Sequence, residues 1–249
     1  MIGVIAKREA TALFRTPLAW ALLAMTQFVL AYQFLAQIEV YLQFEDKLRS
    51  MSEAPGVTEV VVTPTIGTGA MLMLFVIPVL TMSSICGERR NGTLALLYSS
   101  PLTCAEIIVG KFFGVCFLLS LMWAIVALMP LSLMWGAPLD LGTYACGLGA
   151  LALLMVTYAA IGVMFSTLFT QPAVSAVMSF GLLGTLWLID WATRLGQDAG
   201  LFAYLSSLNH FQRLAGGLVN SADISYFVAL IIAALAVSTW RLNGDRKPL

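Results

Sequence analysis

Charged residues are scarce in this chain of 249 residues, which has 13 Lys and Arg, 13 Asp and Glu, and a formal net charge of zero. Hydrophobic residues make up 60% of it, and the mean hydropathy is +0.90. So few charges cannot provide the polar surface of a soluble globular protein, so the composition indicates an integral membrane protein. The zero net charge gives no reason to expect nucleic acid as a partner.

Residues for metal or nucleophilic chemistry are also few. His210 is the only histidine, which excludes a site with several histidine ligands and leaves Ser-His proteolysis without a partnered serine motif. We expect it to be a surface or interfacial histidine. The four cysteines show no C-x-x-C spacing, so we expect packing residues rather than disulfides or zinc ligands: Cys86, Cys104, Cys116 and Cys146.

A nucleotide-binding loop is missing as well. A P-loop requires the pattern G-x-x-x-x-G-K-[ST], and its nearest approach is residues 105–112. That stretch ends in Gly110-Lys111 but lacks the first glycine and the hydroxyl that would hold magnesium. ATP is therefore hydrolysed by another chain or not at all, and we expect no cofactor on this one.

Long apolar runs are abundant. Because they show no period-2 alternation and each approaches the roughly 20 residues that a bilayer requires, they predict membrane-spanning helices. Six runs qualify, at 17–42, 66–86, 108–136, 142–168, 172–190 and 223–240. The predicted fold is an all-α polytopic membrane protein with six spans in a single transmembrane domain, residues 1–249.

The basic residues orient these spans, because Lys and Arg concentrate at cytoplasmic ends. With both termini inside, nine basic residues lie on the cytoplasmic side: Lys7, Arg8, Arg15, Arg89, Arg90, Lys111, Arg241, Arg246 and Lys247. Four lie outside: Lys47, Arg49, Arg194 and Arg213. We therefore predict that both termini are cytoplasmic.

Residues 1–16 carry an amphipathic pattern. One helical face is apolar, with Ile2, Ile5, Ala6, Ala10, Leu13 and Phe14, and the other is polar, with Lys7, Arg8, Thr11 and Arg15. This predicts an interfacial helix that ends at Thr16, before Pro17. The alternative is a basic flank that only anchors the first span. Since the following run is long and has no clear small-x-small cleavage site, we expect a span rather than a signal peptide.

A patterned polar segment separates the second and third runs. Glu88, Arg89 and Arg90 mark the exit from lipid, and Asn91-Gly92 indicates a turn. After Thr93, Leu94, Leu97 and Tyr98 follow the spacing of a short helix with one apolar face. Ser100 and Pro101 end that helix. Thr103 and Glu106 have the spacing of a capping box that begins the next helix, before Gly110 and Lys111.

Such a surface helix, joined to two spans, suits docking of a soluble partner that moves both. The alternative is a helix that only completes a loop. The run E-R-R-N-G-T-L-A-L-L-Y-S-S-P-L-T-C-A-E-I-I-V-G-K resembles the signature of the ABC-2 type permeases, the membrane subunits of type-2 ABC transporters. The residues that carry this resemblance are Glu88, Arg89, Arg90, Gly92, Thr93, Leu96, Leu97, Ser100, Pro101, Glu106, Ile107, Gly110 and Lys111.

The resemblance implies a non-catalytic permease in a bacterial cytoplasmic membrane. It would dimerise with a second copy or a homologous permease and bind two separate ATPase subunits, which hold ATP and magnesium. It would move a substrate outward or pass force to an extracytoplasmic partner. Residues 87–107, which we name the coupling segment, would contact the ATPase through these residues: Glu88, Arg89, Arg90, Gly92, Thr93, Leu94, Leu97, Tyr98, Ser100, Pro101, Thr103, Glu106 and Lys111.

Within this family the stretch LNHFQRLAGGLVNSADISYF (208–227) is similar to the gliding-motility and nitrous-oxide-reductase-maturation branch. Two departures stand out. Ala95 replaces an acidic residue common in the family, and Gly216-Gly217 replaces an Arg-Gly pair. The external segment 191–222 is expected to hold a helix at the outer surface, with or without a ligand.

Three polar residues interrupt the first span. Gln27, Gln33 and Gln37 could form a polar conduit or a dimer face, or only ordinary interhelical hydrogen bonds. A stand-alone secondary transporter or channel is the alternative function. The predicted spans contain almost no ionisable residue that could form a proton relay or an ion site, which counts against it. A membrane-embedded enzyme lacks the residues it would need. Outside the membrane, Val60-Val61-Val62 is expected to be extended.

Overall fold

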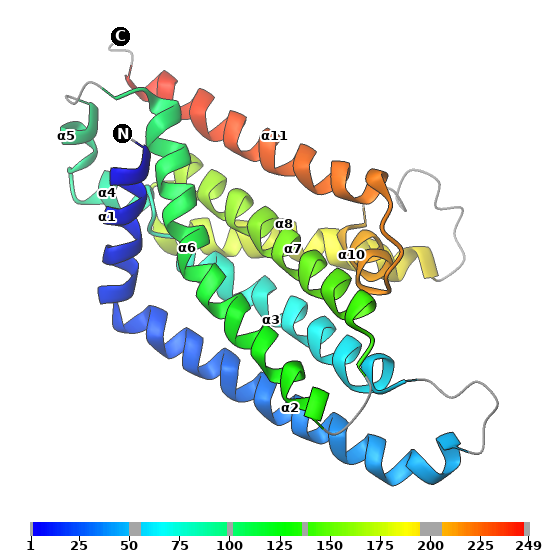
Figure 1. The fold of residues 1–249 in the computed structure, drawn as a ribbon. Helices are drawn as coiled ribbons and strands as arrows, with labels where there is room; N and C mark the ends of the chain where they lie inside the picture. The colour runs from blue at the N-terminus through cyan, green and yellow to red at the C-terminus, as the bar shows by residue number, and fades with distance from the viewer. Residues whose placement is uncertain (1, 50–55, 99–101, 136–138, 195–205, 247–249) are drawn as a thin grey trace.

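The computed structural model describes residues 2–49, 56–98, 102–135, 139–194 and 206–246, and most of these residues lie in helices (Figure 1). Six helical stretches in this part of the chain are long and apolar enough to cross a membrane. They are Pro17–Phe44, Thr58–Arg90, Cys104–Trp135, Leu141–Leu168, Pro172–Ile189 and Ser221–Arg246. The prediction of an all-α protein with six spans is confirmed.

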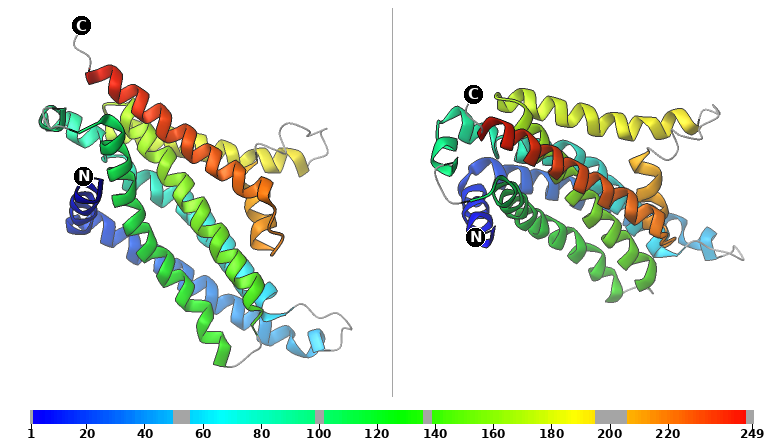
Figure 2. Two further views of the ribbon diagram at one scale, coloured as in Figure 1. Left: turned by 45° about the horizontal axis from the view of Figure 1, so that its top comes forward. Right: turned by 90° about the horizontal axis from the view of Figure 1, so that it is seen from above.

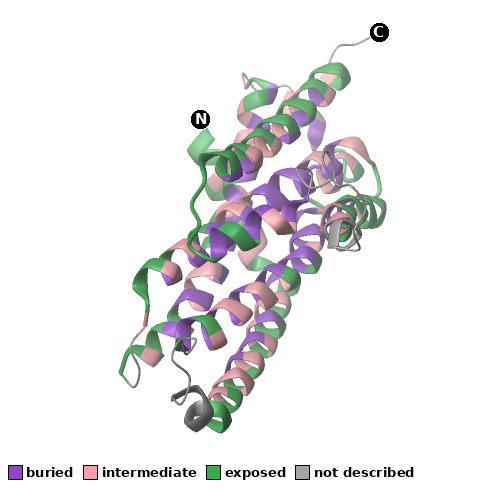
Figure 3. Ribbon diagram, turned by 90° about the vertical axis from the view of Figure 1, so that its right-hand side faces the viewer, coloured by how far each residue is buried: buried purple, intermediate pink, exposed green. Residues whose placement is uncertain are grey.

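Helix α7 (Leu141–Leu168) lies at the centre of the bundle and is the most buried span (Figure 3). It packs against α3 (Thr63–Thr81), α6 (Cys104–Leu131) and α11 (Ser221–Arg246). Its small residues permit this approach. A Cβ on Gly162 would lie 2.0 Å from Oγ1 of Thr81, so only glycine fits there.

The outer helices are α2 (Pro17–Arg49), α8 (Pro172–Arg194) and α11, and their spans bury the fewest residues. Large apolar side chains on them are exposed, among them Phe28, Tyr32, Leu188 and Ile232. Because lipid chains are as apolar as these side chains, such exposure suits a helix that faces a bilayer.

The second span begins with a short π-helix, Thr58–Val62, that continues into α3. The expectation that Val60-Val61-Val62 is extended was wrong. Val61 packs in a small apolar cluster with Phe34 and Val57, and the Thr58 hydroxyl accepts a hydrogen bond of 2.9 Å from the Asp140 amide. Tertiary packing thus overrides the strand preference of β-branched residues.

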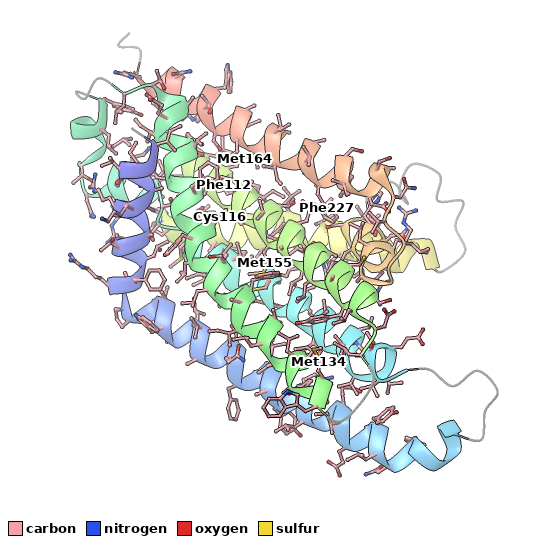
Figure 4. All side chains as sticks on the ribbon, viewed as in Figure 1. Phe112, Cys116, Met134, Met155, Met164 and Phe227 are labelled. Carbon is pink, nitrogen blue, oxygen red and sulfur yellow. The ribbon has the colours of Figure 1, made fainter. Side chains whose placement is uncertain are left out.

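Helix α6 leads into a short 3-10 helix, Ser132–Trp135, and lies beside α7 (Figure 4). A small apolar hollow of about 150 Å3 lies between parts of the two helices, and Cys116 of α6 and Met155 of α7 both line it. Large apolar side chains of α7, such as Leu151, Leu154 and Tyr158, belong to the main apolar core.

One end of the bundle collects four segments that are distant in the sequence (Figures 1 and 2). These are α1 (Ile2–Arg15), α4 (Cys86–Arg90), α5 (Leu94–Tyr98) and the last turns of α11. We name this the terminal end, because both chain termini lie there. Helix α10 (Ser207–Ala215) lies at the opposite end, beside the start of α11.

Candidate functional site

The coupling segment forms the predicted turn and short helix at the terminal end. Helix α4 ends at Arg90, and Gly92 then adopts a left-handed conformation with φ +71°. The amide and hydroxyl of Thr93 donate back to the Glu88 carbonyl, at 3.0 and 3.3 Å, before α5 begins at Leu94. Of the predicted docking residues, Ser100 and Pro101 lie outside the described residues.

The predicted capping box at the start of α6 is confirmed. The Thr103 hydroxyl accepts a hydrogen bond of 3.2 Å from the Glu106 amide, and the Glu106 carboxylate accepts one of 3.0 Å from the Thr103 amide. The bonds satisfy two donors that a helix N-terminus otherwise leaves unpaired, so they define where the third span begins.

A buried lysine joins three segments at this end. Lys111 of α6 is 2% exposed, and its ammonium lies 2.9 Å from the Glu9 carboxylate of α1 and 3.1 Å from the Glu88 carboxylate of α4. The ammonium also donates to the Ser84 carbonyl at 2.7 Å, while the Ser84 hydroxyl donates to Glu9 at 3.0 Å. Because a buried charge is costly unless paired, this cluster holds α1, α4 and α6 together.

Two glycines allow α1 to reach α6. A Cβ on Gly110 would lie 2.7 Å from the Ile5 Cβ, and one on Gly114 would lie 2.5 Å from the Glu9 Cβ and 2.9 Å from the Ala6 carbonyl oxygen. Contacts this short do not occur, so a side chain at either glycine would separate the helices. The Gly-x-x-x-Gly spacing thus brings Glu9 within reach of Lys111.

The last turns of α11 bind the coupling segment from the other side. Arg89 and Asp245 form an ion pair at 2.5 Å, and Arg241 lies 3.3 Å from the same carboxylate. The Arg246 guanidinium donates to the backbone carbonyls of Leu102 at 2.6 Å and Tyr98 at 3.1 Å. The C-terminal helix is therefore part of this site, which sequence reasoning missed.

Ser166 of α7 stabilises the break between α3 and α4. Its hydroxyl accepts hydrogen bonds from the Ile85 amide at 2.9 Å and the Cys86 amide at 3.1 Å, and donates to the Met82 carbonyl at 3.1 Å. A break in a helix frees backbone groups that need partners. No sequence pattern pointed to Ser166, because its partners lie about 80 positions away.

The apolar face of α5 packs on the protein itself. Leu94 is buried, and Leu97 and Tyr98 are half-buried against a second apolar cluster, where burial raises the pKa of the Tyr98 phenol. This cluster consists of Ile85, Leu94, Cys104, Ile107, Ile108, Val163 and Leu242. Arg90, Asn91 and Gly92, in the turn before α5, are exposed, so this turn is accessible to a partner.

The three glutamines of the first span lie away from this site. The Gln27 amide contacts the Met129 sulfur of α6 at 3.5 Å, while Gln33 and Gln37 are half-buried on α2. All three lie on the outer helix α2, and Gln27 takes part in its packing against α6.

His210 is buried rather than at the surface, and the sequence prediction was wrong. Its Nδ1 lies 2.5 Å from Oδ1 of Asp223, which also pairs with Arg213 at 2.6 Å, and its ring stacks on Tyr226. The buried Oδ2 of Asp223 has no hydrogen-bond partner within the described residues. The cluster joins α10 to α11. In the sequence, this cluster is indicated only by the spacing of His210 and Arg213, which lie one helical turn apart and therefore on the same side of a helix.

These features define a multi-pass α-helical membrane protein whose coupling segment is bound by α6 and by the C-terminal helix α11. A comparison with family models matches residues 4–245 to the ABC-2 family transporter proteins, so the chain belongs to that family. Its members are typically non-catalytic membrane subunits. A comparison with curated proteins finds no match.

Proposed function

We propose that this chain is the permease subunit of a type-2 ABC transporter and that the coupling segment docks a separate ATPase subunit, two copies of which serve a permease dimer. ATP hydrolysis, with magnesium on the partner, then drives outward movement of a substrate or transmission of force to an extracytoplasmic partner. Residues 1–249 act as one transmembrane domain. In this proposal the terminal end is cytoplasmic, in a bacterial inner membrane.

The observation that carries this proposal is the double attachment of the coupling segment. Glu88 binds Lys111 of α6, and Arg89 and the Tyr98 carbonyl bind the end of α11. A segment held at several points moves with the helices that hold it, so a push on the exposed turn would reach α1, α3, α6 and α11 together. A segment that only completed a loop would not need the ion pair with the buried Lys111 or the contacts with α11.

The test is purification of the tagged protein from its host, with mass spectrometry of what accompanies it. We expect an ATPase subunit with a Walker A motif, and we expect Arg90→Glu to abolish its recovery because Arg90 is exposed on the turn. The matched control is Arg15→Glu, an equal charge reversal on α1. Equal recovery with both variants would contradict docking at the turn, and a stand-alone transporter would then be the better reading.

We propose further that Gln33 and Gln37 face a second permease copy, since polar side chains in a span are retained where they find partners. Disulfide crosslinking of Gln33→Cys and Gln37→Cys should trap a dimer in membranes, whereas Phe28→Cys on another face should not.

The resemblance over residues 208–227 supports assignment to the gliding-motility branch. An encoded extracytoplasmic companion would test that assignment.

A further inference from the structure

Helix α1 borders two adjoining hollows of opposite character at the terminal end. The first is an open surface site on the polar face of α1, and every residue that lines it belongs to that helix, including Lys7, Arg8 and Arg15. The second has a volume of about 610 Å3 and lies between α1 and α6, lined by Ala10, Phe14, Phe113 and Phe117. Lys7 and Thr11 line both, so the hollows meet at these residues.

The basic hollow carries charge that the protein leaves uncompensated. Within the described residues no acidic side chain forms an ion pair with Lys7 or Arg15, and both are exposed. Arg8 reaches Glu88 only at 4.0 Å and is 69% exposed. The nearby acid on α1, Glu9, is occupied by Lys111 instead. The hollow is therefore suited to an anion.

The second hollow is aromatic and apolar. Phe113 and Phe117 lie one turn apart on α6 and are 53% and 62% exposed, within a membrane-spanning helix. Phe14 meets Phe117 edge to face at 6.1 Å and Trp20 at 5.9 Å. The Trp20 indole donates to the Phe14 carbonyl at 2.7 Å, which fixes the elbow between α1 and α2. These contacts give the hollow a rigid wall suited to a hydrocarbon chain.

An anion site that continues into an apolar groove fits an amphiphile. The groove between α1 and α6, at about 610 Å3, falls within the roughly 300–1,000 Å3 of ordinary ligand sites, and the open basic face of α1 adjoins it. Helix α1 lies beside the first turns of α6 at a steep angle to α2 (Figure 1). We propose that α1 and α6 bind one anionic phospholipid of the leaflet at the terminal end, with its phosphate at Lys7 and Arg15 and an acyl chain against Phe113 and Phe117.

The site has a physical consequence for the chain. A lipid held there would contact the exposed side of α1. It would not replace the ion pair between Glu9 and Lys111. Basic residues at an anionic surface each strengthen lipid binding about fivefold, so two of them distinguish anionic from neutral lipid by about 20–30-fold. The inference requires only that the protein spans a membrane, and it does not depend on the ATPase.

The experiment is native mass spectrometry of the full-length protein in detergent, titrated with phosphatidylglycerol or phosphatidylcholine of the same acyl chains. We expect the first bound phosphatidylglycerol to be preferred about 20-fold or more. Lys7→Gln with Arg15→Gln should remove that preference and leave phosphatidylcholine binding unchanged. The matched control is Arg90→Gln, which removes a basic charge of the terminal end outside both hollows and should keep the preference.

Two further measurements make the proposal falsifiable. Phe113→Ala with Phe117→Ala should weaken binding of both lipids at this site, and an excess of inorganic phosphate should not displace the phospholipid. An undiminished preference in the Lys7 and Arg15 variant would overturn the proposal. Displacement by inorganic phosphate would also overturn it, in favour of a free-anion site. Circular dichroism establishes that each variant remains folded, and the single variants Lys7→Gln and Arg15→Gln replace the double variant if it does not.

Discussion

Lys111 and Glu88, which stand near opposite ends of the patterned segment, form a buried ion pair at 3.1 Å. The segment therefore closes on itself, and Glu9 of α1 completes the cluster at 2.9 Å from the same ammonium. The two charged residues that begin and end this run of the sequence thus meet in the structure. The N-terminal helix is part of the same unit.

Lys111→Met should destabilise the protein by about 3–5 kcal/mol, because it leaves two carboxylates close together without their cation. Thermal unfolding in detergent measures this. The matched control is Lys7→Met, which removes an exposed lysine and should have little effect. Adding Glu88→Gln to Lys111→Met should recover part of the loss, as expected for residues that interact directly. An unfolding temperature equal to that of the wild type would refute the cluster.

Gly114→Ala should displace α1 from α6, since the new Cβ would lie 2.5 Å from the Glu9 Cβ. Amide hydrogen exchange across residues 2–15 should increase. Gly149→Ala is the control, because that glycine of α7 has no atom within 4 Å of the added Cβ. It should be neutral or stabilising by about 0.5–1 kcal/mol, the usual gain of alanine over glycine in a helix. Unchanged exchange in the Gly114 variant would contradict the close approach.

Ser166→Ala should destabilise the break between α3 and α4, because the Ile85 and Cys86 amides lose their acceptor. Each buried donor left without a partner costs about 1–3 kcal/mol. Ser238→Ala provides a matched control, since that buried hydroxyl only donates to the Ala234 carbonyl of its own helix. Equal losses of stability in the two variants would show that the serine does not hold the break.

Arg246→Ala should loosen the coupling segment without unfolding the bundle, because the Tyr98 and Leu102 carbonyls lose their donor. We expect faster hydrogen exchange across residues 94–98 and reduced recovery of an ATPase. Arg241→Ala is the control, since its contact with Asp245 lies within one helix and is largely exposed. If both variants exchange at the wild-type rate, α11 does not restrain the segment.

Asp223→Ala should release α10 from α11, because His210 and Arg213 both lose the carboxylate they share. Hydrogen exchange across residues 207–215 should rise, while exchange at the terminal end stays unchanged. Ser225→Ala, at an exposed position of the same helix, should alter neither region. Exchange that rises equally at both ends would indicate general unfolding instead of a local attachment.

Features that depend on neighbouring residues could be predicted from the sequence. The six spans follow from apolar runs long enough to cross a bilayer, which any chain of this composition must bury. The capping box follows from Thr103 and Glu106, three positions apart, and the turn at Gly92 follows from the Asn-Gly pair. Each of these depends on contacts within about one helical turn, so residue order alone determines them.

Tertiary structure decided which segments meet. Glu9 and Lys111 are separated by 102 positions, and Arg246 and Tyr98 by 148, and no periodic pattern relates such distant residues. A pattern shows that a helix has an apolar face, but not which other helix covers it. For this reason the sequence predicted a surface or interfacial position for His210, whereas the structure buries it against α11. Packing of α1, α4 and α6 against one another brought Glu9, Glu88 and Lys111 together and buried the lysine, because contacts between whole helices depend on the tertiary structure.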